Sequence, residues 1–358
     1  MDAIESLDSE KQGRIRLGFI WATLCAVLWG SGYVVLSIEW QCFPFAGGTA
    51  TYISDDTVST LFSGMVISGC QSVVIVIVLF LVWTSLHKKS KEVVRTIAKP
   101  GISKWFLLGA VLGGPMAIYG NMIATTYVGA TYASTIALLY GAIGVIIAKV
   151  LYREKYSAKA ALGITIVILG GIFIVDPVNM VREITSETAR DGMWIGYLGG
   201  ILSAFGWALE ANFAARGLDV TDADSSLVVR YTWEAIIWFL IFIPIGILIC
   251  GEGSASLVAD ALTSSQFLFW LCFAALSLGM CYVAEYKAIP LIGVGRTLSV
   301  ASLYAIVSIF FLWAFCGNAP SHLVAVGAAM GVIGTFVIYW EGSRTLGNGI
   351  RDTGEGLP

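Results

Sequence analysis

Residues 131–176 read TYASTIALLYGAIGVIIAKVLYREKYSAKAALGITIVILGGIFIVD. Two apolar runs, 131–151 and 158–176, are separated only by a short polar segment that contains Arg153 and Lys155. A helix needs about 20 apolar residues to cross the hydrocarbon core of a membrane, because each residue rises about 1.5 Å. The stretch therefore predicts two consecutive membrane-spanning helices joined by a short basic turn.

The same pattern extends along the whole chain. Of the 358 residues, 57% are hydrophobic and 13% are charged, a composition too apolar for a water-soluble domain of this length. Ten segments have the length and apolar character of a membrane span: 17–40, 59–83, 104–127, 131–151, 158–176, 192–215, 226–250, 267–288, 293–315 and 320–340. We therefore expect an all-α integral membrane protein with ten transmembrane helices.

Lysine and arginine residues are distributed unevenly between the predicted loops. With the N-terminus in the cytoplasm, 18 of the 21 fall in inner segments, while Arg182 and Arg190 fall in an outer loop and Arg230 lies inside the seventh helix. Cytoplasmic loops of membrane proteins are enriched in these two residue types. We therefore predict a multi-pass protein of the cytoplasmic (inner) cell membrane, with both termini in the cytoplasm.

The two halves of the chain resemble each other. A shift of 164 residues superposes Tyr140 on Tyr304, and a shift of 178 residues superposes Trp29 on Trp207. Each half holds five predicted helices, so the second half is expected to be inverted relative to the first, as in many secondary transporters. The expected organisation is a cytoplasmic N-terminal tail (1–16), a first five-helix repeat (17–176), a second, inverted five-helix repeat (177–340) and a cytoplasmic C-terminal tail (341–358).

The stretch Tyr127–Ile174, with REKYS at 153–157, and the LWGS at 28–31 resemble the drug/metabolite transporter superfamily, EamA type. The resemblance implies ten helices in two inverted repeats, around a central cavity lined by helices 1, 3, 4, 6, 8 and 9. Members of the family often have a proline midway along helices 4 and 9, where this chain has Gly141 and Ala305. No proline is present at these positions to kink the helices, although glycine can still bend a helix. The family carries very different substrates, so the resemblance indicates transport rather than any one substrate.

Three glutamates, Glu210, Glu234 and Glu285, lie within predicted spanning helices. An ionisable residue at the centre of a bilayer costs roughly 3 kcal/mol by insertion scales, so each of them needs a physical reason. Arg230 precedes Glu234 by four residues and Lys287 is close to Glu285, so structural ion pairs are the alternative for these two carboxylates. Glu210 has no cation within the spanning part of its own helix. We therefore expect Glu210 to compensate the positive charge of a substrate.

Aromatic residues accompany these glutamates. Trp207, Tyr231 and Tyr282 each precede a glutamate by three residues and therefore share its helix face. Further candidates near mid-membrane depth are Trp29, Tyr33, Tyr119, Asn121, Tyr140 and Tyr304. Aromatic rings beside a carboxylate favour an organic cation once water is excluded. The alternative for the rings is helix packing, and for Asn121 it is a hydrogen bond between helices.

Together these patterns predict a secondary transporter that moves a small organic cation or zwitterion, of the choline, quaternary amine or amino acid type, by alternating access. A proton or another coupling ion is expected to exchange at a buried glutamate. One alternative is an exporter of amino acids or drug-like metabolites in which the glutamates are structural. A membrane-embedded enzyme and an assembly subunit are alternatives of other classes.

The sequence offers little for catalytic, metal or nucleic-acid sites. It has only His87 and His322, no HExxH or GxSxG motif and no CxxC pair, so we expect no enzyme, no metal site and no cofactor. The net charge of -3 provides no basic surface for nucleic acid. The expected partners are a small-molecule substrate and the lipid bilayer, with the chain acting as a monomer or homodimer.

Overall fold

The computed structural model describes residues 2–46, 51–154, 156–175, 193–317 and 322–339, together with residues 178, 181, 182 and 185. Over these residues the chain is helical with short connecting turns, and they include no strand. The α-helices are α1 (Asp2–Glu39), α2 (Asp56–Ile77), α3 (Ser90–Ile97), α4 (Pro100–Val111), α5 (Tyr119–Ala137), α6 (Leu139–Tyr152), α7 (Ala158–Val175), α9 (Met193–Leu218), α10 (Ala223–Ile237), α11 (Ile243–Cys250), α12 (Glu252–Thr263), α13 (Ser265–Ile292), α14 (Val294–Ala301), α15 (Tyr304–Cys316) and α16 (His322–Tyr339). Three π-helical segments continue α2, α4 and α10: η1 (Val78–Thr84), η2 (Leu112–Ile118) and η3 (Trp238–Phe242).

Within the described residues, each predicted segment is helical over most of its length. Six helical stretches are long and apolar enough to cross a membrane: Gln12–Glu39, Asp56–Thr84, Pro100–Gly129, Ala223–Cys250, Ser265–Ile292 and Val294–Phe315. Shorter apolar helices occupy Leu139–Tyr152, Ala158–Phe173 and His322–Ile338. The chain is therefore an all-helical, multi-pass membrane protein.

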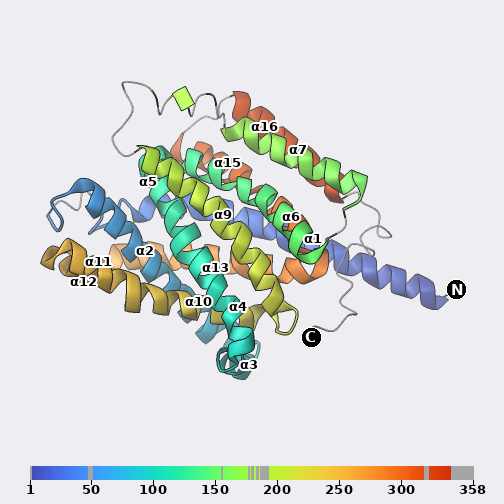
Figure 1. Cartoon of the computed structure of the whole chain (residues 1–358), viewed down its shortest axis with the longest axis horizontal. Helices are drawn as coiled ribbons and strands as arrows, with labels where there is room; N and C mark the ends of the chain where they lie inside the picture. Colours follow the sequence, from blue (N-terminus) through green and yellow to red (C-terminus); the bar gives the residue numbers. More distant parts are fainter. Residues whose placement is uncertain are drawn as a thin grey trace.

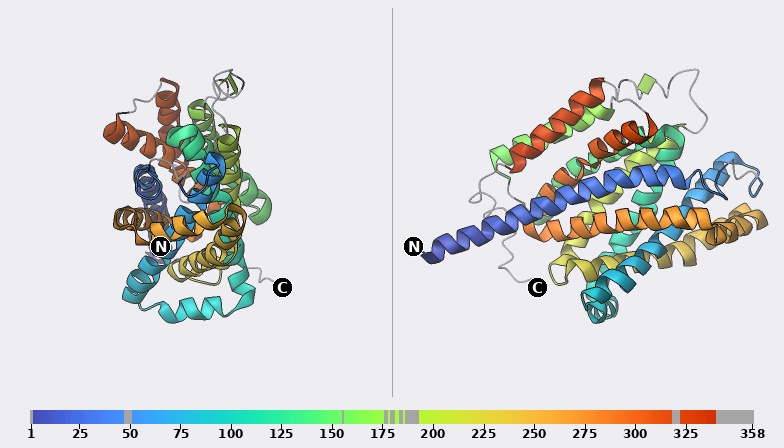
Figure 2. Two further views of the ribbon diagram at one scale, coloured as in Figure 1. Left: turned by 90° about the vertical axis from the view of Figure 1, so that its left-hand side faces the viewer. Right: turned by 180° about the vertical axis from the view of Figure 1, so that it is seen from behind.

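The ends of the chain differ from the prediction in one respect. Helix α1 begins at Asp2 rather than near residue 17, and its N-terminal part projects beyond the bundle (Figure 2). The added turns contain no proline and are rich in residues that favour helices, so the apolar span continues into them without a break. The predicted C-terminal tail, 341–358, lies outside the described residues.

Two long helices are interrupted midway, although neither has a proline at the break. Helix α5 gives way to α6 at Leu138, and α14 gives way to α15 at Ser302 and Leu303. The two breaks face each other, because a Cβ on Gly141 would lie 3.1 Å from the Cβ of Ser302. Both helices are therefore interrupted without the proline that often stands there in the family. The helices pack closely at these breaks, and the hydroxyl of Ser302 donates to the carbonyl of Ser299. Packing and such side-chain bonds can bend a helix that has no proline.

Helices from the two halves of the chain pack in pairs. Helix α1 lies beside α13, α5 beside α9, and α7 beside α16, the last pair forming one edge of the molecule (Figures 1 and 2). The α7–α16 contact depends on glycine. A Cβ on Gly163 would lie 2.7 Å from the carbonyl oxygen of Gly334, and a Cβ on Gly334 would lie 2.6 Å from that of Gly163. The two backbones therefore touch where neither residue has a side chain.

Replacing Gly163 by leucine is expected to separate α7 from α16, because its side chain has no space against the backbone of Gly334. We expect a loss of roughly 1–3 kcal/mol or more of folding free energy from this overpacking. The matched control is Gly101→Leu, since nothing lies within 4 Å of a Cβ there. Thermal unfolding of the purified variants in detergent measures both, and equal melting temperatures would contradict the close contact.

Candidate substrate site

A small cavity lies in the middle of the bundle, between α1, α2, α5, α9, α10 and α13. Its volume is about 30 Å³, which is space for about two water molecules. The lining is mostly apolar and aromatic: Trp29, Gly32, Tyr33, Leu36, Gln71, Ile75, Ile118, Asn121, Met122, Trp207, Tyr231, Leu278 and Tyr282. An organic cation does not fit this volume, so the surrounding helices have to separate before one can bind.

Six of the predicted aromatic residues meet beside this cavity, and we call them the aromatic cluster: Trp29, Tyr33, Tyr140, Trp207, Tyr282 and Tyr304. Trp29 is at the centre. Its ring centroid lies 4.8 Å from that of Tyr304, 4.6 Å from that of Trp207 and 5.5 Å from that of Tyr282. Tyr140 and Tyr304 each lie directly after a helix break, so the interruptions of α5–α6 and α14–α15 present them to the cluster.

Polar atoms of the cluster are bonded between helices. The indole nitrogen of Trp207 donates to the hydroxyl of Tyr282 at 2.7 Å, and the side-chain amide of Asn121 donates to the hydroxyl of Tyr33. Asn121 therefore makes the expected interhelical hydrogen bond and also lines the cavity, where its carbonyl oxygen has no partner among the described residues. Gln71, which the sequence did not single out, lines the same cavity, and its amide nitrogen likewise lacks a partner within the described part of the chain.

Tyr119 lies apart from the aromatic cluster. Its hydroxyl donates to the carbonyl of Leu61 at 2.9 Å, and its ring packs against Trp238 at 5.7 Å. It belongs to a second apolar core beside α2 and α11. Its predicted depth in the membrane placed Tyr119 with the aromatic cluster, but its side chain contacts Leu61 and Trp238 instead.

Two of the three predicted glutamates share one arginine. The Nε of Arg230 lies 3.2 Å from a carboxylate oxygen of Glu210, and its Nη2 lies 3.2 Å from a carboxylate oxygen of Glu234. All three side chains are fully buried, and the hydroxyl of Tyr286 donates to Glu210 at 2.6 Å. The predicted Arg230–Glu234 pair is therefore present. Glu210 has the same partner, from the neighbouring helix α10 rather than from its own helix.

The guanidinium of Arg230 also lies over the rings of two of the predicted aromatic residues. It lies 4.3 Å from the ring centroid of Tyr231 and 4.6 Å from that of Tyr282. Planar guanidinium groups stack favourably on such rings. A cation of the chain itself thus fills this side of the site, which leaves the Trp29 side of the aromatic cluster next to the cavity.

Two glycines of η2 leave space for the buried triad of Glu210, Arg230 and Glu234. A Cβ on Gly113 would lie 2.0 Å from the Nη2 of Arg230, and a Cβ on Gly114 would lie 2.7 Å from the carboxyl group of Glu234. Both glycines are in η2, where the widened helical turn brings the backbone against the charges. The sequence gives no sign of this role until the neighbouring helix is known.

Glu285 has different surroundings from the other two glutamates. It is buried, and the thiol of Cys25 is its hydrogen-bond donor at 3.8 Å, while Cys25 and Cys281 are 3.5 Å apart through their sulfur atoms. Lys287, the alternative partner weighed from the sequence, bonds Asp224 at 3.2 Å instead. The salt bridges of the described residues do not include Glu285.

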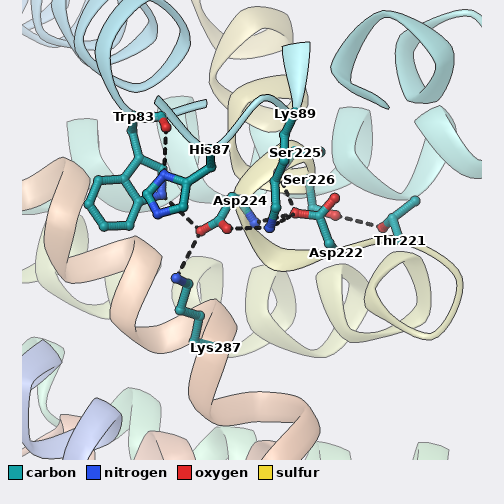
Figure 3. A network of polar contacts seen from close by, with 9 residues as sticks. All are labelled: Trp83, His87, Lys89, Thr221, Asp222, Asp224, Ser225, Ser226 and Lys287. Carbon is teal, nitrogen blue, oxygen red and sulfur yellow. Dashed lines mark hydrogen bonds and ion pairs between the residues drawn. The ribbon is translucent and has the colours of Figure 1, made fainter. Parts of the chain in front are cut away.

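A second polar group, here named the Lys89 cluster, joins the ends of four elements (Figure 3). It consists of Trp83, Lys89, Asp222, Asp224 and Lys287. Lys89 lies 2.9 Å from Asp222 and 2.6 Å from Asp224, and Asp224 also accepts from the Trp83 indole at 2.9 Å. The Lys287 ammonium lies over the rings of Trp21 and Trp83, at 5.0 and 5.1 Å. The cluster therefore ties the ends of η1, α3, α10 and α13 together at one end of the bundle, and Lys287 also contacts α1 through Trp21.

The charges of Lys89 and Asp222 are stable over a wide pH range. Partial burial by itself raises the pKa of Asp222, but hydrogen bonds from Lys89 and Ser225 outweigh it and bring the pKa below its usual value. Partial burial likewise lowers the pKa of Lys89, yet the bonds to Asp224 and Asp222 raise it above its usual value. The aspartate contribution is thus present above about pH 4, and the lysine contribution is present below about pH 10.

We expect the variant Asp222→Asn to lower the melting temperature at neutral pH by no more than a few degrees, because Lys89 and Asp222 are both about one-third exposed. The wild-type advantage should disappear as the pH falls through the lowered pKa of Asp222. Thermal unfolding from pH 2 to pH 8 measures this. An advantage that is undiminished at the acid end, or that vanishes already near pH 6, would show that the Asp222 ion pair does not produce it.

Comparison with known protein families finds a matching family model. Residues 194–340 match the model of the EamA-like transporter family. These residues belong to that family. The resemblance to EamA-type drug/metabolite transporters predicted from the sequence is confirmed. The EamA region holds α9 to α16, and with them the buried triad, Glu285, Trp207, Tyr282 and Tyr304.

Solved structures support the fold over most of the chain. Chains of solved structures that match number 28. One of them is the crystal structure of a protein that superposes with a TM-score of 0.55 and 15% sequence identity. The match covers 91% of this chain and 97% of that chain. At this identity the likeness shows the fold alone. No curated protein matches the sequence. The EamA match over residues 194–340 and the apolar helices together indicate a membrane transporter of the drug/metabolite type.

Proposed function

We propose that the chain is a secondary transporter of a small organic cation or zwitterion, of the choline, quaternary amine or amino acid type. One observation carries the proposal: the middle of the bundle buries three carboxylates, of Glu210, Glu234 and Glu285, against one guanidinium, that of Arg230. A dry interior stabilises an excess of negative charge only if protons or cations balance it. An organic cation beside Trp29 supplies such a charge and gains cation–π attraction as well.

Alternating access is the proposed transport mechanism, with two inverted five-helix repeats of residues 17–176 and 177–340. The packing supports this symmetry, because α1 pairs with α13 as α9 pairs with α5. Backbone angles support it too. Gly129 and Gly293, which the shift of 164 residues superposes, have φ/ψ of 86°/156° and 84°/162°. The helix breaks at Leu138 and Ser302 obey the same shift. Interrupted helices in matching positions are typical of transporter binding sites.

The proposed topology has both termini in the cytoplasm. The Lys89 cluster then lies at the cytoplasmic end of the bundle and closes the cavity from that side, because it joins the helix ends that surround the path inward. Opening toward the cytoplasm requires Lys89 and Lys287 to separate from Asp222 and Asp224. Proton exchange at Glu285 is the proposed coupling step, since a thiol is the one donor to this carboxylate among the residues that the structure describes.

Choline and its uncharged carbon isostere, dimethylbutanol, provide the test. The two molecules have nearly the same shape, so a difference in binding to the purified protein reports on charge. We expect choline to stabilise the protein in a thermal-shift assay and to be taken up by liposomes that contain it, while dimethylbutanol does neither. Equal effects of the two compounds would refute a cation site.

A second candidate is an exporter of amino acids or drug-like metabolites with structural glutamates. The pairing of Glu210 and Glu234 with Arg230 favours it, because both carboxylates already have a cationic partner. A panel of neutral and anionic metabolites separates the candidates. Transport of those compounds without competition from choline would favour the exporter.

A further inference from the structure

Glu39, at the end of α1, is a buried carboxylate with no evident structural partner. Its exposed fraction is 0%, and neither carboxylate oxygen has a hydrogen-bond partner among the described residues. The salt bridges of these residues do not include it either. Burial of an ionised carboxylate without donors costs several kcal/mol, so the side chain is stable here only in its neutral, protonated form.

The described side chains around Glu39 offer no positive charge. Cys42, on the same segment, and Cys70, on α2, are the titratable groups that interact with it, and neither thiol carries a positive charge. The Cys42 thiol donates to the carbonyl of Ile38 rather than to the carboxylate. The surrounding core is otherwise apolar and includes Leu36 and Phe45.

Glu39 continues the face of α1 that lines the central cavity. Trp29, Tyr33 and Leu36 line the cavity at helical spacings of four and three residues, and Glu39 follows Leu36 by three more. On α2, Gln71 lines the cavity directly after Cys70. A row of side chains therefore leads from the aromatic cluster to Glu39, at the end of α1 opposite the Lys89 cluster.

We propose that Glu39 is a proton-binding site at the outer end of the transport path. This inference rests on the proposed function and adds a proton that must bind before the outer end closes. In the closed arrangement the carboxyl group holds the proton. When the outer end opens, the O–H bond breaks, the proton passes to external water and the carboxylate remains, until a proton binds again before closure.

A proton fits this site better than a metal cation. Hard cations such as sodium require several oxygen ligands, whereas the neighbours of Glu39 are thiols and apolar side chains. The described residues contain no group of three His, Cys, Asp or Glu side chains that is suited to hold a metal ion. A single neutral carboxylic acid requires no further ligand.

The test uses the isosteric variant Glu39→Gln, with Glu252→Gln as the control, because Glu252 is exposed and lies after α11. Choline uptake into liposomes is measured while the external pH is varied at constant internal pH. For one proton that must bind at Glu39 from the outside we expect wild type and control to change by up to about tenfold per pH unit, and Glu39→Gln by less than about twofold. An unchanged pH profile in Glu39→Gln would overturn the proposal, and so would a sodium requirement that this variant removes.

Infrared spectroscopy of the purified protein separates this inference from the transport hypothesis. We expect the carbonyl band of a protonated, dry carboxylic acid in wild type and in Glu252→Gln, and a smaller band in Glu39→Gln. The variant Glu39→Asp, which keeps an ionisable group, should retain the band. A missing choline flux together with this spectral loss would refute only the substrate. An identical band in all variants would refute the proton site, whatever the flux.

Discussion

Replacing Arg230 by methionine is expected to destabilise the protein by about 3–5 kcal/mol, the usual consequence of removing one partner from a buried ion pair. The guanidinium is fully buried and lies 3.2 Å from both Glu210 and Glu234. Without it, two carboxylates remain in a dry interior with no cation beside them. Thermal or denaturant unfolding in detergent measures the loss.

A second variant distinguishes this electrostatic effect from lost packing. The triple change Arg230→Met, Glu210→Gln and Glu234→Gln removes all three charges and should recover most of the stability. Arg14→Met is the matched control, because Arg14 is exposed. If the triple variant is no more stable than Arg230→Met, the carboxylates are not the source of the loss.

Replacing Trp29 by alanine is expected to weaken choline binding by about 30-fold or more, equivalent to roughly 2 kcal/mol. Trp29 contacts four rings of the aromatic cluster and lines the cavity. Its removal takes away the largest π face next to the site. Isothermal titration of the purified protein with choline measures the change.

Trp29→Phe keeps an aromatic face and should lose much less affinity than Trp29→Ala. Trp105→Ala is a matched control, since Trp105 packs against Phe213 outside the cluster. Full choline affinity in Trp29→Ala would contradict the assignment of the site, even if transport itself continued.

Much of the fold follows from hydropathy and spacing alone. The predicted helical segments coincide with observed helices because lipid requires every backbone amide to be bonded within its own segment. The start of α1 was missed because polar residues ahead of a span leave no hydropathy signal. The breaks at Leu138 and Ser302 were missed because they depend on contacts between the two halves rather than on proline.

The candidate site was predictable in its parts but not in its pairing. Mid-helix depth selected Trp29, Trp207, Tyr140 and Tyr304, which do meet. The same depth also selected Tyr119, which points elsewhere. Depth specifies a level in the membrane, whereas the rotation of each helix decides which residues face one another.

Charge pairs across helices were the main omission. Arg230 was assigned to Glu234 by its spacing of four residues, but its contact with Glu210 spans two helices and leaves no sequence pattern. Lys287 bonds Asp224 across helices for the same reason. Glu39 was overlooked because it closes an apolar span next to Trp40, where carboxylates usually reach water.

Alternating access is tested most directly by labelling the cavity from each side of the membrane. Leu278, which lines the cavity on α13, is replaced by cysteine in a variant whose native cysteines have been removed. Oriented vesicles are then treated with a membrane-impermeant maleimide on one side at a time. We predict labelling from both sides, and conditions that increase labelling from one side should decrease it from the other. Labelling from a single side under all conditions, or from neither, would contradict a site that faces each side in turn.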